Sequence, residues 1–184
     1  QSSAEFSDQL KHGKYDFCYV NPQQYTLLHQ DAGYTAFAKQ KDHLLQGIIV
    51  VNKNSGITKL TELKDQKLAF PSPTSFGASI LPQAELKQMG IAIIPEYVKS
   101  HDSVYLNVAK NRYIAGGGVL RTFELLSPEL KEQLTIIMTT QNYTPHAIAS
   151  HSTVDIKVQE KVLDAMLNMS NDPQGLQLLD AIGF

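Results

Sequence analysis

The 184-residue chain has one cysteine, no tryptophan and a net charge of only −2. A disulfide needs two thiols, so a chain whose only cysteine is Cys18 cannot form an internal disulfide. A single cysteine also excludes a cysteine-rich metal site. Its neighbours Phe17 and Tyr19 favour a buried structural thiol. So little net charge, with no basic block, predicts that the protein has no nucleic-acid partner. The sequence also has no apolar run as long as a bilayer-spanning helix needs.

The sequence patterns of common enzymes are missing too. The six histidines show neither His-x-x-x-His nor His-Glu-x-x-His spacing, so we expect no metal site. Without a Walker sequence or Gly-x-Gly-x-x-Gly, the chain offers no support for nucleotide chemistry. Ser75, His101 and Asp102 are the residue types of a hydrolase triad. The Gly-x-Ser-x-Gly turn is absent, however, and adjacent His and Asp residues are badly placed for a triad. We therefore expect neither an enzyme nor a cofactor.

Helix and strand patterns alternate along the chain, which predicts an α/β fold with mostly parallel sheets. Asn21-Pro22 matches a helix N-cap followed by proline at the first helical position. Strands are expected over residues 15–20, 44–51, 67–70, 95–99, 113–115 and 134–138. A C-terminal helix is expected to place Val158, Val162, Ala165 and Met169 on one face, and Asp172-Pro173 to begin a last helix.

Two stretches have the character of crossings between lobes, one over 47–52 and the other over 143–150. Two crossings predict a lobe inserted into another that is built from both chain ends. We place the inserted lobe at 51–145 and the discontinuous lobe at 1–50 and 146–184.

The most informative segment follows the predicted strand over 67–70. There Pro71-Ser72-Pro73-Thr74-Ser75-Phe76-Gly77 leads into an amphipathic stretch. A strand that ends in Ser or Thr before a helix leaves the first helical N–H groups unpaired. These donors, the Thr74 and Ser75 hydroxyls and the helix dipole can all point at one anion. Gly77 allows close approach of the backbone. An ordinary helix cap is the alternative.

A second polar connection follows the expected strand over 95–99. Ligands of open α/β sheets bind at the carboxyl ends of strands, where helix N-termini converge. Ser100 or Asp102 is expected to cap the next helix, and His101 to donate a ring N–H to the ligand. The alternative is a structural or solvated histidine.

A third connection is expected at Gly116-Gly117-Gly118, which we predict to end the strand over 113–115. Adjacent glycines either form a simple turn or let the backbone approach a ligand. Arg121 follows closely enough for a charge-assisted bond to an oxyanion, the alternative being an ion pair with Glu124 or Asp102.

With these segments in view, the chain resembles the substrate-binding proteins of phosphate, phosphite and phosphonate ABC transporters over most of its length. The resemblance rests on the order and spacing of four segments, 15–22, 68–79, 100–104 and 115–119. It implies a type II periplasmic-binding-protein fold, with two α/β lobes joined by two hinge strands and a ligand trapped on closure. The family's opening strand, helix and strand have no counterpart here, so the resemblance implies an incomplete first lobe.

Carried over by residue, the resemblance implies that hydroxyls and backbone amides of the second lobe bind the oxyanion oxygens, aided by the histidine. Aromatic and amide side chains of the first lobe border the pocket. The complete set of predicted ligand-binding residues is Thr74, Ser75, Phe76, Gly77, His101, Tyr19, Asn21, Tyr25, Gly117 and Arg121.

The resemblance further implies a periplasmic receptor that captures a phosphorus oxyanion and passes it to an ABC permease. Aminophosphonate binders use acidic residues where this chain has Gly116-Gly117-Gly118. We therefore expect phosphate, phosphite or a simple alkylphosphonate. The protein is expected to be a monomer unless another chain completes the first lobe. The alternative is a ligand-sensing domain of a signalling protein such as a histidine kinase.

Overall fold

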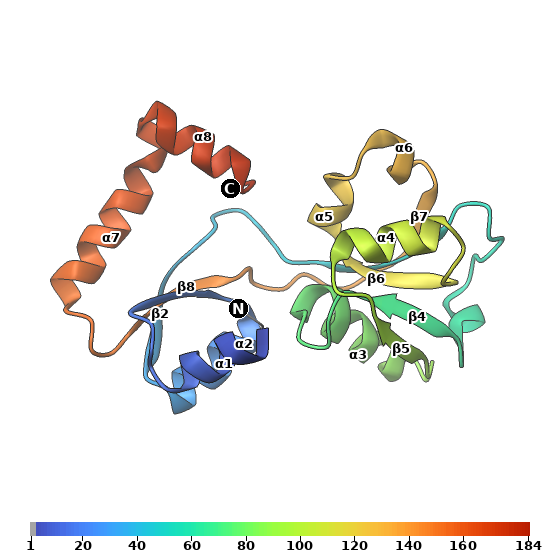
Figure 1. Cartoon of the computed structure of the whole chain (residues 1–184), viewed down its shortest axis with the longest axis horizontal. Coiled ribbons are helices and arrows are strands. Elements are labelled where there is room, and N and C mark those ends of the chain that lie inside the picture. The colour runs from blue at the N-terminus through green and yellow to red at the C-terminus, as the bar shows by residue number, and fades with distance from the viewer. Residues whose placement is uncertain (1–2) are drawn as a thin grey trace. The chain divides into compact units, whose positions relative to one another are not determined.

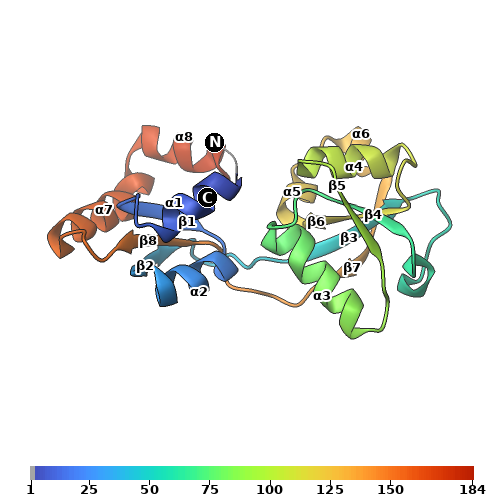
Figure 2. The ribbon, with the colours of Figure 1, turned by 60° about the horizontal axis from the view of Figure 1, so that its bottom comes forward.

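The computed structural model describes residues 3–184 and divides the chain into two compact units (Figures 1 and 2). Unit 1 comprises residues 1–43 and 144–184, and unit 2 comprises residues 44–143. These boundaries differ from the expected 50/51 and 145/146. The reason is that strand β3 (Gly47–Asn52) pairs with β6 (Ala115–Val119) and β7 (Leu134–Thr139) of unit 2.

Unit 1 is built around a three-stranded sheet with the order β1-β8-β2, in which β8 runs antiparallel to both neighbours. Asn21 caps a helix through a capping box, as predicted. The elements of unit 1 are α1 (Ser3–Lys11), β1 (Phe17–Val20), α2 (Pro22–Asp31), β2 (Tyr34–Lys39), β8 (Ala147–His151), α7 (Ile156–Asn168), the 3₁₀ helix η3 (Met169–Asn171) and α8 (Pro173–Ala181).

The core of unit 1 is a single small cluster. Its buried members are Leu10, Cys18, Val20, Leu28, Tyr34 and Ala149. The prediction of a buried thiol is thus confirmed, and burial raises the pKa of Cys18 to about 11. A thiol with such a pKa is inert at neutral pH.

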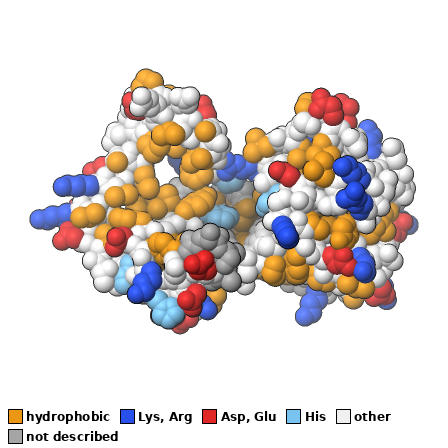
Figure 3. Space-filling model, viewed as in Figure 1, with side chains coloured by type: hydrophobic (Ala, Val, Ile, Leu, Met, Phe, Trp, Pro, Cys, Tyr) orange, Lys and Arg blue, Asp and Glu red, His pale blue; other side chains and the backbone are white. Residues whose placement is uncertain are grey.

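Helix α7 contributes little to this core. None of its side chains, all of which the structure describes, is buried. Ile156 and Leu167 remain 59% and 67% exposed. Figure 3 shows hydrophobic side chains at the surface of unit 1, where α7 and α8 lie. The helix is joined to the sheet by Ser150 Oγ, which donates to Gln159 Oε1 at 2.6 Å, but its apolar side chains are not buried.

Unit 2 is built around a five-stranded mixed sheet with the order β5-β4-β6-β3-β7. Its elements are β3, the 3₁₀ helix η1 (Leu60–Leu63), β4 (Lys67–Phe70), the π-helix η2 (Phe76–Ile80), α3 (Leu81–Gln88), β5 (Ile94–Tyr97), α4 (His101–Ala109), β6, α5 (Leu120–Glu124), α6 (Pro128–Lys131) and β7.

The prediction of mostly parallel sheets is wrong. Strand β4 is parallel to β5 and β6, whereas β3 is antiparallel to β6 and β7. The chain enters unit 2 along β3 and leaves it along β7, so these neighbouring strands run in opposite directions. The strands β2 and β8 were not predicted at all.

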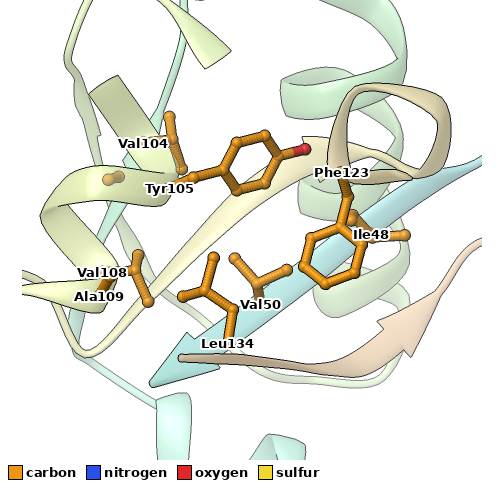
Figure 4. Packing of buried hydrophobic residues seen from close by; sticks show 9 residues of the cluster. Ile48, Val50, Val104, Tyr105, Val108, Ala109, Phe123 and Leu134 are labelled. Carbon is orange, nitrogen blue, oxygen red and sulfur yellow. The ribbon is translucent and has the colours of Figure 1, made fainter. Parts of the chain in front are cut away.

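Strand β3 is buried along its whole length, as its continuous apolar sequence predicts. Ile48 and Val50 face α4 in one cluster, part of which Figure 4 shows. Ile49 and Val51 face the opposite cluster, which includes Leu86 of α3. Two covered faces give unit 2 a rigid frame for the segments that follow its strands.

Candidate functional site

Three strands of unit 2 end at one edge of the sheet. Strands β4 and β5 are in register, with Phe70 opposite Tyr97, and Val98 N–H donates to the Phe70 carbonyl at 2.8 Å. Strand β6 runs parallel to β4 on its other side. The segments after β4, β5 and β6 therefore begin at the same edge, which we call the carboxyl edge. This is where parallel α/β sheets bind ligands.

The segment after β4 opens into a π-helix. Ser75, in an extended conformation, accepts at its carbonyl from the N–H groups of Ser79 at 2.9 Å and Ile80 at 3.1 Å. A helix supplies no acceptor for its first N–H groups, so those of Phe76 and Gly77 are available to a ligand. Single π turns are frequent at functional sites. The predicted strand–turn–helix is confirmed, but the sequence contained no signal for the π turn.

Four hydroxyl residues belong to this segment. Thr74 is exposed, with its Oγ1 3.4 Å from Ser72 Oγ, and Ser75 is half-buried. Ser79 is fully buried, and its Oγ has no hydrogen-bond partner among the described residues. A buried hydroxyl without a partner is costly. Sequence reasoning missed Ser79, whose only signal was a hydroxyl within the apolar run Gly77-Ala78-Ser79-Ile80.

Gly77 has a packing role as well. A Cβ at this position would lie 2.9 Å from Val119 Cγ2 and 3.1 Å from Leu45 Cδ1. The absence of a side chain therefore lets the π-helix lie close to the end of β6, whatever it binds.

The segment after β5 carries His101 as the first residue of α4. Ser100, rather than Asp102, is the cap, since its Oγ accepts from Ser103 N–H at 3.1 Å. His101 Nδ1 is buried and has no hydrogen-bond partner within the described chain. Burial lowers the pKa of His101, and the nearby Asp102 opposes this shift. The ring is therefore neutral at pH 7 and carries one N–H donor.

We expect His101 to make stability depend on pH. With the folded-state pKa below the ordinary value of about 6.5, the unfolded chain binds the proton more readily, so unfolding is favoured as pH falls below 6.5. His101→Gln should flatten this dependence in urea titrations between pH 7.5 and 5. His146, whose pKa is also lowered by burial and by His43, supplies the comparison variant His146→Gln. A pH profile identical to wild type in His101→Gln would contradict the assignment.

The segment after β6 differs from its prediction. Strand β6 spans Ala115–Val119, so Gly116-Gly117-Gly118 forms the strand instead of ending it. A Cβ on Gly117 would lie 2.2 Å from the Ala78 carbonyl oxygen and 2.4 Å from the Phe70 ring. The space beside these glycines is occupied by neighbouring elements and is not open. Contact of Gly117 with a ligand stays a prediction.

Arg121 lies in the first turn of α5, directly after β6 at the carboxyl edge. Leu120 N–H donates to the Gln46 carbonyl at 3.0 Å and ties this turn to the start of β3. The sheet topology thus brings the segments of Ser75, His101 and Arg121 to one edge.

The predicted residues of unit 1 follow or lie near the end of β1. Asn21 Oδ1 accepts from Gln24 N–H at 2.9 Å, so this side chain is a helix cap. Tyr25 Oη accepts from Ala36 N–H at 3.2 Å. Tyr19 is 47% exposed and stacks on His146, with ring centroids 5.1 Å apart. Contact of these three residues with a ligand stays a prediction.

Over the part of the chain that the structure describes, no cluster of three or more His, Cys, Asp or Glu side chains is arranged to hold a metal ion. No helix among the described residues has the length and apolar character to cross a membrane. A cavity of about 670 Å³ in unit 2 lies beside β7, with Phe123, Lys131 and Ile136 in its wall, and involves none of the predicted site residues.

Comparison with known proteins agrees with this architecture. A family model described as "ABC transporter, phosphonate, periplasmic substrate-binding protein" matches residues 1–184. PhnD1 from Prochlorococcus marinus, solved with methylphosphonate, is 18% identical with a TM-score of 0.85, over 98% of this chain and 74% of that one. A binding protein component of an ABC phosphonate transporter from Pseudomonas aeruginosa is 14% identical with a TM-score of 0.78, over 97% and 65%. A Xanthomonas citri protein solved with chloride is 19% identical with a TM-score of 0.80, over 96% and 71%.

The fold defines the class, a type II periplasmic binding protein with two α/β units linked by two chain crossings. Within this class the chain belongs to the family of periplasmic substrate-binding proteins of phosphonate ABC transporters. Membership gives it a solute-binding role, with a small ligand and a transporter permease as partners, and an extracytoplasmic location. The family is a transport family and not an enzyme class. That the first lobe is incomplete stays a prediction.

Proposed function

We propose that the carboxyl edge of unit 2 binds a phosphorus oxyanion without an amine, namely phosphate, phosphite or a simple alkylphosphonate. The observation that carries this proposal is the meeting of two kinds of donor at one sheet edge. The π-helix begins there with no side-chain cap on its first N–H groups, and α4 begins there with the buried, partnerless Nδ1 of His101.

This edge suits an anion even though its donors are mostly neutral. Backbone N–H groups, hydroxyls and a helix N-terminus are fixed in place, so they need little reorganisation when a charge arrives. Thr74 and Ser75 add hydroxyl donors, and Arg121 adds a charged donor on the neighbouring turn. A neutral His101 donates one N–H or accepts a hydrogen bond from the hydroxyl of a protonated oxyanion.

We propose a ligand without an amine because of the charges that the site offers. An ammonium group needs a carboxylate to offset its desolvation. Strand β6, where aminophosphonate binders of this family place acidic residues, carries glycines in this chain. Glycine has no side chain, so the stretch Gly116-Gly117-Gly118 brings no charge to the ligand.

We further propose that the protein is a periplasmic receptor that delivers its ligand to the permease without chemical change, acts as a monomer and binds no nucleic acid. The relatives solved with methylphosphonate and with chloride support an anion as ligand. Neither the family match nor these structures favours the alternative of a kinase sensor domain.

A ligand screen tests the proposal. A ligand that binds only the folded state adds about 2.7 kcal/mol of stability at 100 times its dissociation constant. We expect phosphate, phosphite or methylphosphonate to raise the melting temperature, and 2-aminoethylphosphonate to raise it less at equal concentration. Sulfate at the same ionic strength is the control for a general anion effect. Tight binding of the aminophosphonate alone would overturn the preference for an amine-free ligand, and no response to any of the four would overturn the site.

A further inference from the structure

A buried tyrosine connects two of the segments at the carboxyl edge. Tyr105 is fully buried, and its Oη lies 2.8 Å from Thr122 Oγ1 and donates to the Val119 carbonyl at 3.2 Å. Thr122 Oγ1 donates to the same carbonyl at 2.8 Å. Each hydroxyl has one proton, so two of these three contacts are hydrogen bonds at any one time. Together they link Tyr105, Thr122 and the Val119 carbonyl at the end of β6, where no side chain caps α5.

The network lies between two candidate ligand residues. Tyr105 follows His101 by four positions on α4, so both side chains lie on one face of that helix. Thr122 follows Arg121 directly in the first turn of α5. The Tyr105 hydroxyl therefore joins the helix that begins with His101 to the turn that carries Arg121. Figure 4 shows the Tyr105 ring crossing from α4 with its oxygen on the side of Phe123 in α5.

The surroundings are shaped around this hydroxyl. A Cβ on Gly118 would lie 2.2 Å from Tyr105 Oη, so the glycine in β6 makes room for it. Burial raises the pKa of Tyr105 to about 12, which keeps the hydroxyl protonated and a donor at physiological pH. The Tyr105 ring also packs edge-on against Phe123, with ring centroids 6.0 Å apart. This packing uses the ring and does not need the hydroxyl.

We propose that Tyr105 is a positioning residue for anion binding, whose hydroxyl holds the start of α4 and the β6–α5 turn in fixed relation so that His101 and Arg121 act on the same ligand. The inference rests on the proposed function, because it concerns the same edge. The ring supplies the packing, and the hydroxyl adds a link that a phenylalanine lacks.

Three variants separate positioning from packing. Tyr105→Phe removes only the hydroxyl, and Thr122→Val removes its partner while keeping the side-chain shape. Thr122→Ser keeps the hydroxyl and should restore wild-type behaviour. The matched control is Tyr113→Phe, since Tyr113 Oη donates to Glu96 at 2.7 Å before the start of β6, away from the carboxyl edge.

The readout is the affinity for methylphosphonate by calorimetry together with the melting temperature. One hydrogen bond of this kind corresponds to about a five- to tenfold change in an equilibrium constant. We expect Tyr105→Phe and Thr122→Val each to weaken binding by about that factor. Tyr113→Phe should lower the melting temperature and leave the affinity unchanged. In a His101→Gln background the effect of Tyr105→Phe should shrink to about twofold, because one of the two groups that it holds in fixed relation is gone.

Each other outcome counts against the inference. Affinity within twofold of wild type in Tyr105→Phe and Thr122→Val, or the same loss from Tyr105→Phe with and without His101, would leave the tyrosine a packing residue. If Tyr105→Phe fails to fold, Thr122→Val against Thr122→Ser decides. A wild-type protein that binds no phosphorus oxyanion would instead overturn the proposed function, and the inference with it.

Discussion

Replacing Thr74 and Ser75 together by alanine is expected to weaken the binding of methylphosphonate by at least about 100-fold. Both hydroxyls precede the π-helix at the carboxyl edge, where we propose that they replace water around the anion. A hydrogen bond to a charged group is worth about 1.5–3 kcal/mol, and each 1.4 kcal/mol is a tenfold change in affinity. Isothermal calorimetry on the double variant measures the effect directly. Because Thr74 is exposed and Ser75 half-buried, the fold should be retained.

The matched control is a double variant of two other hydroxyl residues in unit 2. Thr58 and Thr61 are exposed and precede the opposite end of β4. Thr58→Ala with Thr61→Ala should bind like wild type. If Thr74→Ala with Ser75→Ala also binds like wild type, the segment after β4 is an ordinary helix start and the proposed site is wrong.

Gly117→Ala should lower the free energy of unfolding by about 3 kcal/mol, near the upper end for overpacked cores. The added methyl would meet the backbone oxygen of Ala78 and the Phe70 ring, both in the tightly packed interior. A backbone atom cannot turn aside as a flexible side chain can. Urea denaturation of the variant and the wild type gives the difference.

Gly56→Ala separates this clash from the general cost of replacing glycine. A Cβ on Gly56 would have no neighbour within 4 Å, so only its positive φ of 75° is unfavourable. That conformation costs an L-residue about 1–2 kcal/mol. If Gly117→Ala keeps full stability and loses only ligand affinity, the glycine contacts the ligand after all, as the sequence pattern suggested.

The sequence predicts best where local chemistry decides the structure. Asn21 and Pro22 begin a helix, and the apolar run over 44–51 leads to strand β3, which is buried along its whole length. The order of segments that resembles the phosphonate-binding family is confirmed by the family match over residues 1–184. For the helix cap and the buried strand, the residues that form the sequence pattern are also those that make the stabilising contacts.

Prediction failed where distant parts of the chain decide. Strand β8 is stabilised by pairing with β1 and β2, and nothing within residues 147–151 announces these partners. The run Gly116-Gly117-Gly118 is rich in a residue that weakens strands, yet packing of α4 and the π-helix against it fixes an extended conformation.

The candidate site was predicted in outline because its residues follow strands that end together. The role of each individual residue was harder to predict from the sequence. Ser100 caps α4 in place of Asp102, and Ser79 is buried without a partner. Both depend on side-chain geometry that spacing does not encode. The position of the Tyr105 hydroxyl depends on Gly118 of β6, the strand against which α4 packs.

Because none of the α7 side chains is buried, the free energy needed for local opening differs between the two units. Segments with few buried apolar contacts open at low energetic cost, well before the molecule unfolds as a whole. Solvent exchange and proteases therefore gain access first to the C-terminal helices of unit 1. The sheet that supports His101 and the π-helix is covered on both faces and stays closed through such openings.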